Sequence, residues 1–210
     1  MEGDRERWNA KWRERAGDLE PPTRFVEEHL ALLPRRGRAL DVAGGAGRHA
    51  VLLARHGLDV TLVDGSDVAL EQAERRATTV GVVGRIRLVR HDLDDPLPFA
   101  PLFDVLVMVH YLNREQRDAL AELLVVDGLL IAMQPTVKNL ERHASPSRRF
   151  LVEEGELETW ATRLGFDVEV AREGWTVEGR HEAELVARKR PRARVLPPRE
   201  PPMGPSGPYR

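Results

Sequence analysis

The stretch that decides the fold is Ala39–Gly47, with sequence ALDVAGGAG. We expect a short strand over residues 39–43, a glycine loop over 44–47, and a helix from Arg48 to His56 that Gly57 ends. Glycine is needed where the backbone adopts positive φ or approaches a ligand closely. Because the N–H groups at the start of a helix point at whatever binds there, this arrangement favours a site for a nucleotide-like ligand over a simple tight turn.

Strands and helices alternate along the next part of the chain. The further strands are predicted over residues 58–63, 86–89, 103–109 and 129–133, and the helices over 66–80 and 113–124, with Ser66 and Asn113 as N-caps. The run Phe103–Val109 is almost continuously apolar, which is typical of a strand buried on both faces of a parallel sheet. Asp127-Gly128 is expected to turn the chain into the strand at 129. This alternation predicts crossover units and a parallel sheet.

The last third of the chain has a different pattern. A polar loop is expected over residues 135–149, followed by a helix over 153–164. The strands predicted over 166–171 and 182–188 are separated only by a short turn region, so one of them must run antiparallel to the rest of the sheet. The sequence therefore predicts an α/β fold with a doubly wound, mostly parallel seven-stranded sheet and a C-terminal antiparallel hairpin.

The chain divides into three parts by composition. Residues 1–34 form an N-terminal helical cap, in which Trp8 and Trp12 lie one helical turn apart and a second helix covers about 23–33. Residues 35–189 form the main domain. Residues 190–210 are rich in proline and arginine without periodicity, and we expect a disordered tail.

Composition excludes several classes of function. The 210 residues are 41% hydrophobic and 31% charged with a net charge of −2, so no overall basic field indicates nucleic-acid binding. The absence of cysteine excludes disulfides and thiolate chemistry, and no cluster of His, Asp or Glu has the spacing of a metal site. The charged N-terminus and the lack of a long apolar run predict a cytoplasmic protein without a membrane segment. Nothing in the sequence indicates an oligomeric state.

Two nucleotide cofactors fit the glycine loop. Residues 45–50 match the relaxed G-x-G-x-x-A fingerprint of dinucleotide binding, and Asp64 lies near the position of its ribose-binding acid. Asp41 favours S-adenosylmethionine instead, because a pyrophosphate gains nothing from a carboxylate there, whereas an ammonium group and a sulfonium do. Asp92, after the third strand, is placed to accept a hydrogen bond from an adenine amino group, and the terminal hairpin is not required by a plain dinucleotide fold.

Four segments, in their order and spacing, resemble the class I S-adenosylmethionine-dependent methyltransferases. Residues 40–47 resemble motif I, D/E-x-G-x-G-x-G, while 63–66 resemble the ribose-binding segment, 91–93 the adenine-binding segment and 103–107 the start of the fourth strand. The resemblance covers about 22–189, and the nearest subgroup is the small tellurite-resistance and thiopurine-type methyltransferases. Ala43 departs from the first glycine of motif I and is expected to crowd the loop slightly, with Gly44 restoring the room.

The resemblance implies a Rossmann-like fold, S-adenosylmethionine as cofactor and S-adenosylhomocysteine as product. It also implies that Asp64 holds the ribose hydroxyls, that Asp92 binds the adenine amino group and that Asp41 orients the ammonium. The implied cofactor-binding residues are Trp12, Asp41, Ala43, Gly44, Gly45, Gly47, Arg48, Asp64, Gly65, Ser66, Asp92, Leu93 and Val109. The alternatives are that Asp64 is only an acid at a helix N-terminus, Asp92 a turn residue and Arg48 a solvent-facing side chain.

Methyl transfer from a sulfonium needs positioning and desolvation, and it needs a general base only when the acceptor arrives protonated. The acceptor is expected at the carboxyl end of the fourth strand, where His110 and Tyr111 are the candidate catalytic residues. The alternative is that His110 is only a hydrogen-bonded part of the pocket wall and that Tyr111 is only a packing residue. Because residues 109–113 lack the D/N-P-P-Y/F pattern of amino-methylating nucleic-acid enzymes, a small-molecule acceptor is favoured.

Two segments are candidates for a lid over the site, namely the tryptophan helix and the basic loop at 135–149. Packing and solvation are the alternative explanations for these two features. Two other functions compete with methyl transfer. One is an NAD-dependent oxidoreductase, and the other is a cofactor-binding module that regulates without catalysing.

Overall fold

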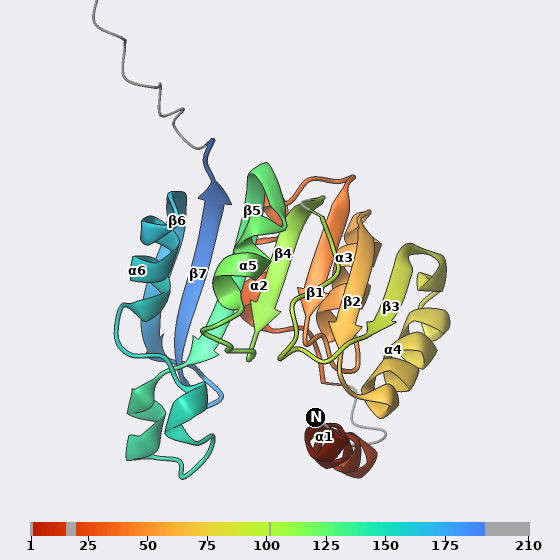
Figure 1. The fold of residues 1–210 in the computed structure, drawn as a ribbon, viewed down its shortest axis with the longest axis horizontal. Helices are drawn as coiled ribbons and strands as arrows, with labels where there is room; N and C mark the ends of the chain where they lie inside the picture. Colours follow the sequence, from red (N-terminus) through yellow and green to blue (C-terminus); the bar gives the residue numbers. More distant parts are fainter. Residues whose placement is uncertain (1, 16–19, 101, 192–210) are drawn as a thin grey trace, which may run out of the picture.

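The computed structural model describes residues 2–15, 20–100 and 102–191 (Figure 1). The tail expected at 190–210 therefore lies almost wholly outside the described residues. The helices are α1 (Glu2–Glu14), α2 (Arg24–Glu28), α3 (Arg48–His56), α4 (Asp67–Thr79), α5 (Arg117–Glu122) and α6 (Glu156–Arg163). The strands are β1 (Arg38–Val42), β2 (Asp59–Asp64), β3 (Ile86–Arg90), β4 (Phe103–Val109), β5 (Leu124–Pro135), β6 (Phe166–Trp175) and β7 (His181–Lys189). Short 3-10 helices cover Leu30–Leu32, Val83–Arg85, Val137–Glu141 and Arg148–Phe150.

One seven-stranded sheet in the order β3-β2-β1-β4-β5-β7-β6 organises the fold. The first five strands pair in parallel, and β7 runs antiparallel to both β5 and β6. The predicted fold class and terminal hairpin are confirmed. The strand order reverses beside β1, so the carboxyl ends of β1, β2, β3 and β4 meet at one edge, where ligands bind in doubly wound sheets.

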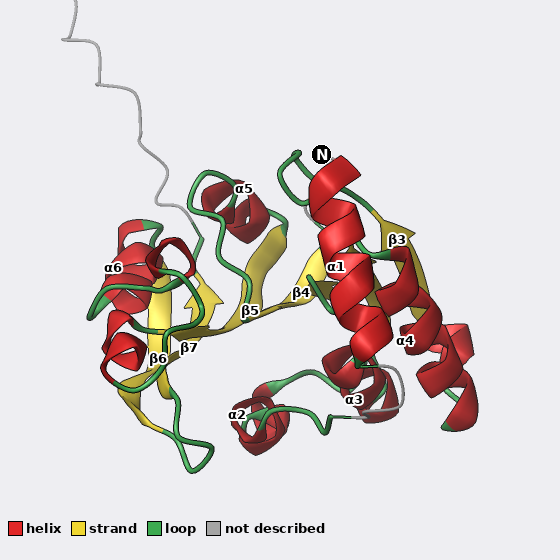
Figure 2. Ribbon diagram, turned by 90° about the horizontal axis from the view of Figure 1, so that it is seen from below, coloured by secondary structure: helices red, strands yellow, loops and turns green. Residues whose placement is uncertain are grey.

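Helices cover both faces of the sheet, as Figure 2 shows. On one face, α2, α3 and α4 pack over β1 and β2 through side chains such as Phe25, Leu53 and Leu70. On the other face, α5 and α6 pack over β4, β5 and β7 through Leu120, Trp160 and their neighbours. Because the central strands are buried on both faces, their sequences are continuous apolar runs rather than alternating ones.

Helix α1 lies across the carboxyl ends of β1 and β2 rather than on either face (Figure 1). It packs against α4, where the Gln72 side-chain amide donates to the carbonyl of Trp12 at 2.8 Å. Trp8 is 45% exposed, whereas Trp12 is half-buried. The two tryptophans therefore occupy different environments, and only Trp12 is held toward the sheet. None of the described helices is long and apolar enough to cross a membrane.

Several boundaries differ from the sequence prediction, most clearly around α5 and β5. The helix expected over 23–33 is α2 followed by the 3-10 helix Leu30–Leu32, and β6 continues to Trp175. The Asn113 side chain accepts hydrogen bonds from the N–H groups of Glu115 and Gln116, but α5 begins only at Arg117 and ends at Glu122. The predicted turn at Asp127-Gly128 is wrong, because β5 already begins at Leu124 and contains both residues. Their position is an irregularity in the pairing with β4, where Asp127 has φ of 65°. Such a bulge leaves residues unpaired while the strand continues, which a local turn pattern does not distinguish from a true turn.

Glu156 fastens the start of α6 to the segment around α5. Its carboxylate accepts hydrogen bonds from Arg114 and Arg117, each at 2.7 Å, while its side chain is 15% exposed. Burial raises the pKa of this carboxyl, but the hydrogen bonds from Arg114, from the Glu153 N–H and from Arg117 outweigh it and lower the pKa to about 2. Ionised Glu156 therefore stabilises the fold.

Glu156→Gln is expected to reduce the free energy of unfolding at pH 7 by roughly 2 kcal/mol. Because the folded pKa is lowered, this contribution is present above the unfolded value of 4.5 and disappears as pH falls toward 2. Urea unfolding at pH 7 and pH 3 measures both values. Glu154→Gln, at a 78% exposed side chain, is the control and should change little. An equal loss at both pH values would contradict this role of ionised Glu156.

Candidate functional site

The glycine loop joins the end of β1 to α3 and lies against the end of β2. Gly45 has φ of 55°, and its N–H donates to Asp64 Oδ2 at 2.9 Å. Gly47 has φ of 75°, and a Cβ placed there would lie 2.9 Å from the Cβ of Ala73. Both positions combine left-handed backbone with close approach, so glycine is required there for the reasons the sequence indicated.

Motif I has its first glycine at the position of Ala43, whereas this sequence has glycine one residue later, at Gly44. Ala43 has φ of 55°, the left-handed conformation that glycine adopts most easily. Gly44 lies outside that region, but a Cβ there would lie 2.6 Å from Leu62 Cγ and 2.8 Å from Asp41 Oδ2. The expected crowding is thus backbone strain at Ala43, and the missing side chain at Gly44 makes room for Asp41.

Asp41 is a buried carboxylate behind this loop. Only 1% of the residue is exposed, and its Oδ2 has no hydrogen-bond partner among the described residues. Burial raises the pKa of Asp41 to about 7, against the lowering effects of the Ala50 N–H and of Arg48. Since an unpaired buried carboxylate is costly, this oxygen is available to a cationic or hydrogen-bond-donating ligand group.

Asp64 ends β2 and binds the backbone on two sides. Besides the N–H of Gly45, it accepts the N–H of Ser66 at 2.8 Å through Oδ1. Burial raises the pKa of this carboxyl, against the hydrogen bonds from Ser66, Gly45 and Gly65. Ser66 caps α4 as predicted, and its hydroxyl donates to Oδ1 of Asn9 at 2.6 Å. Asp64, Gly65 and Ser66 therefore lie together beside the glycine loop and under α1.

Asp92 and Leu93 follow β3 at the same edge. The His91 N–H donates to the backbone carbonyl of Asp64 at 3.1 Å, which places the ends of β2 and β3 side by side. Asp92 is exposed, and its Oδ1 accepts the N–H of Asp94 at 3.1 Å. This contact is the turn geometry that the sequence offered as an alternative to a cofactor role.

Trp12 covers the glycine loop from the α1 side. A Cβ on Gly45 would lie 2.5 Å from Cζ2 of the Trp12 indole, so the ring lies directly against that backbone. Arg48, at the start of α3, donates to Glu20 at 2.9 Å and has a side chain only 22% exposed. Arg48 is therefore not the solvent-facing residue that the sequence allowed as an alternative.

The candidate catalytic residues follow Val109 at the end of β4. His110 has φ of 58° and a side chain 29% exposed, and its Nε2 lies 3.2 Å from Oε1 of Glu182. The hydroxyl of Tyr111 donates to the carbonyl of Leu93 at 2.9 Å. Burial, with Asp94 adding to its effect, raises the pKa of Tyr111 to about 12, so this phenol is poorly suited to accept a proton near neutral pH.

Sequence reasoning missed Glu182, Asn9 and Glu20. Glu182 is 2% exposed on β7, 72 residues from His110, and the only signal for it is an acid at the start of an apolar strand. His49, in the first turn of α3, is buried, and its Nε2 accepts the Thr23 N–H at 3.3 Å. Burial lowers the pKa of His49, so this ring is neutral.

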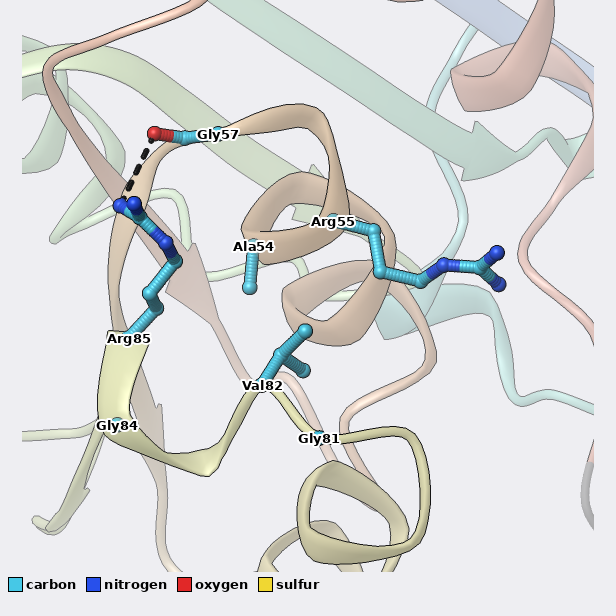
Figure 3. A pocket seen from close by; sticks show the side chains of 7 residues that line it. All are labelled: Ala54, Arg55, Gly57, Gly81, Val82, Gly84 and Arg85. Carbon is cyan, nitrogen blue, oxygen red and sulfur yellow. Dashed lines mark hydrogen bonds between the residues drawn. The ribbon is translucent and has the colours of Figure 1, made fainter.

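The basic loop and two cavities add no second site. The basic residues of this loop have partners in the structure: Lys138 with Glu154, Arg142 over Trp175, His143 with the Gly179 carbonyl, Arg148 with Glu153 and Arg149 over Phe150. A cavity of about 350 Å³ lies between Leu93, Phe99, Tyr111 and α5. Another, of about 460 Å³, lies at the opposite edge of the sheet, between the end of α3 and the turn before β3 (Figure 3). There Arg85 bonds the Gly57 carbonyl and Asp59, while Arg55 points away. The described residues hold no group of three potential metal ligands.

Comparison with known proteins agrees with this geometry. Residues 39–126 match the family model described as a methyltransferase domain. This segment of the chain contains the glycine loop, Asp64, Asp92 and His110. Over this segment the chain is similar to methyltransferase domains. A sequence search of curated proteins finds no match. The alternative of an oxidoreductase has no such support, and the methyltransferase match implies S-adenosylmethionine as the cofactor, as the sequence resemblance did.

Solved structures share the fold of this chain. A TehB-like SAM-dependent methyltransferase from Corynebacterium glutamicum is 22% identical, with a TM-score of 0.62 over 90% of this chain and 100% of that chain. TehB from Haemophilus influenzae is 19% identical, with a TM-score of 0.63 over 79% of this chain and 61% of TehB. The [4+2]-cyclase SpnF is also 19% identical, with a TM-score of 0.62 over 79% and 78% of the two chains. At these identities the likeness concerns the fold alone.

Ala43→Gly and Gly44→Ala form a matched pair of tests of the loop. Gly44→Ala is expected to destabilise the fold by about 1–3 kcal/mol, because the new methyl group overlaps Leu62 and Asp41. Ala43→Gly relieves the strain of the left-handed backbone in the folded state, but it also increases the conformational entropy of the unfolded chain. Because these two effects oppose each other, its free energy of unfolding should stay within about 1 kcal/mol of wild type. Chemical denaturation measures both, and a tolerated Gly44→Ala would contradict the close approach of Asp41 to this backbone.

The buried Asp41 predicts a pH-dependent stability. The unfolded carboxyl ionises near 3.8 and the folded one near 7, so the folded state loses stability as pH rises from about 4 to about 7. Asp41→Asn is therefore expected to raise the free energy of unfolding by roughly 2 kcal/mol at pH 8 and by little at pH 4. Asp59→Asn, at a 71% exposed side chain on β2, is the control. A gain that does not depend on pH would contradict this prediction.

Proposed function

We propose that this chain transfers a methyl group from S-adenosylmethionine to a small-molecule acceptor. The observation that carries the proposal is the unpartnered Oδ2 of Asp41, buried behind a loop whose backbone carries no side chains at Gly44, Gly45 and Gly47. An ammonium group suits that oxygen, whereas a pyrophosphate is repelled by it. The residues present therefore fit the amino-acid half of S-adenosylmethionine.

The remaining cofactor contacts follow the edge of the sheet. Asp64, with Gly65 and Ser66 beside it, is assigned to the ribose hydroxyls, because each carboxylate oxygen retains a lone pair after its backbone hydrogen bond. Asp92 and Leu93 are assigned to the adenine, since they follow the neighbouring strand at the same edge. This order of contacts runs from β1 to β3, as the strand order of the sheet does.

Three further residues complete the proposed cofactor site. Arg48 is assigned to the cofactor carboxylate, in place of its present partner Glu20. Trp12 is assigned to the roof, since its indole lies on Gly45. Val109, at the end of β4, is assigned to the wall. In this proposal residues 1–34 act as a cap that shields the site from water, which favours transfer of a methyl group from a cation to a nucleophile.

The acceptor is proposed to lie over the end of β4. His110 is partly exposed there, and it is the proposed base in preference to Tyr111, whose hydroxyl is bonded to Leu93. A small acceptor fits because α1 covers the neighbouring strand ends. A cytoplasmic location is proposed because the sequence has no apolar run long enough for a membrane helix.

Calorimetry tests the cofactor directly. Wild type is expected to bind S-adenosylmethionine and S-adenosylhomocysteine with a Kd between about 1 μM and 1 mM, and Asp64→Ala should weaken both by at least about tenfold. Asp59→Ala removes a carboxylate from the other end of β2 and should bind as wild type does. Thermal shift with NADH should show no stabilisation. Absence of binding to either adenosyl compound would refute the proposed function.

A non-catalytic module is the competing outcome. Initial-rate assays of S-adenosylhomocysteine release, with panels of hydroxyl, thiol and amine compounds, separate it from an enzyme. Acceptor-dependent release that Asp64→Ala abolishes supports the enzyme, whereas binding without release for any panel supports the module.

A further inference from the structure

His110 is held in an unusual conformation at the carboxyl end of β4. Its φ of 58° lies in the left-handed region, which is strained for a residue with a side chain relative to glycine. The strain is offset by a fixed environment, since its backbone N–H donates to the Met133 carbonyl of β5 at 2.9 Å. Non-glycine residues in this region concentrate at functional sites.

Glu182 faces this imidazole from β7. Its side chain is 1% exposed, its Oε1 lies 3.2 Å from His110 Nε2, and its Oε2 has no partner among the described residues. In the sheet, Glu182 pairs with Pro135 on one side and Gly174 on the other. A buried carboxylate is retained at a considerable cost in desolvation, and His110 is the one side chain that bonds it within the described part of the chain.

The environment of His110 determines which ring nitrogen is available. Glu182 is acceptor-only when ionised, so Nε2 carries the proton and Nδ1 carries the lone pair. Nδ1 makes no hydrogen bond to any of the described residues. Because 29% of the side chain is exposed at the edge where the proposed acceptor lies, we assign this nitrogen to the contact with the acceptor.

We propose that Glu182 and His110 form a dyad that deprotonates an acceptor that arrives protonated, and that this acceptor is a weakly acidic hydroxyl, of the phenol class. This inference rests on the proposed function and names its substrate class. A base held in place by a buried acid contributes nothing to an acceptor that arrives as an anion, such as a thiolate. His110 is the catalytic residue of the dyad and Glu182 is its positioning residue.

The proposed step balances as follows. His110 Nδ1 takes the proton of the acceptor O–H bond, and the oxygen uses the released electron pair to form its bond to the methyl carbon. S-adenosylmethionine, when bound, supplies that methyl group as its sulfur keeps the electron pair of the broken C–S bond, giving S-adenosylhomocysteine. Glu182 stabilises the imidazolium, which then loses its proton to solvent through the exposed edge of the ring.

Kinetics with a matched pair of acceptors tests the dyad. We expect wild type to methylate 4-methylphenol, with kcat reduced about 10²- to 10⁴-fold in His110→Asn, since asparagine tolerates left-handed backbone but cannot act as the base. Glu182→Gln should lower kcat at least about tenfold, because the ring tautomer is no longer fixed. The KM for S-adenosylmethionine and the rate with 4-methylbenzenethiol at pH 8 should change less than about threefold, because that thiol is already ionised.

Glu184→Gln is the matched control for Glu182→Gln. It makes the same change on β7, at a side chain that bonds Arg172 rather than His110, and it should leave the kinetic constants unchanged. Calorimetry with S-adenosylmethionine and thermal unfolding accompany every variant. If wild type does not bind S-adenosylmethionine, the proposed function is refuted. Intact cofactor binding, with wild-type kcat on the phenol in His110→Asn, would overturn the dyad alone.

Long-range ¹H–¹⁵N spectra of the histidine rings give a readout that does not require turnover. The neutral His110 ring is expected to carry its proton on Nε2 in wild type and in Glu184→Gln, and to shift toward the Nδ1–H tautomer in Glu182→Gln, whose amide can donate to Nε2. An Nδ1–H tautomer in wild type, or no change in Glu182→Gln, would overturn the proposal. So would wild-type protein that binds S-adenosylmethionine but methylates thiols and no hydroxyl acceptor.

Discussion

The hydrogen bond from the Gly45 N–H to the Asp64 carboxylate is the contact on which the rest of the site depends. It connects the loop after β1 to the end of β2, and the same carboxylate holds the N–H of Ser66 at the start of α4. Gly45 can make it because its φ of 55° turns the N–H toward β2 without a side chain in the way. Asn9 of α1 accepts a hydrogen bond from the Ser66 hydroxyl, so α1 is attached to the structure that the Gly45–Asp64 hydrogen bond organises.

Three buried carboxylates distinguish this edge of the sheet from the rest of the protein. Burial raises the pKa of both Asp41 and Asp64, and the charge of Asp64 adds to the raised pKa of Asp41. Glu182 lies further along the edge, beside His110. Elsewhere acids such as Glu156 are paired with arginine, which is how a fold normally accommodates them. Carboxylates that are buried without a cation reduce stability, and such a cost is expected at sites that bind or react.

The cap and the hairpin approach this edge from opposite sides. Helix α1 lies across the ends of β1 and β2, whereas β7 brings Glu182 to the end of β4 (Figure 1). The two elements are far apart in the sequence and belong to neither half of the parallel sheet. In the proposed enzyme α1 covers the cofactor and β7 orients the base through Glu182. The parallel strands and the glycine loop alone provide neither of these.

The sequence by itself determined the elements, their parallel or antiparallel sense and the glycine loop, because apolar periodicity, helix caps and glycine positions act over a few residues. It also placed Asp41, Asp64 and Asp92 at strand ends, which parallel pairing brings to one edge. Only the tertiary structure decided that β5 begins before Asp127, that Trp12 lies on Gly45 and that His110 meets Glu182. Those contacts depend on the register of β7 against β5 and on how α1 docks, and such long-range choices leave no period in the sequence.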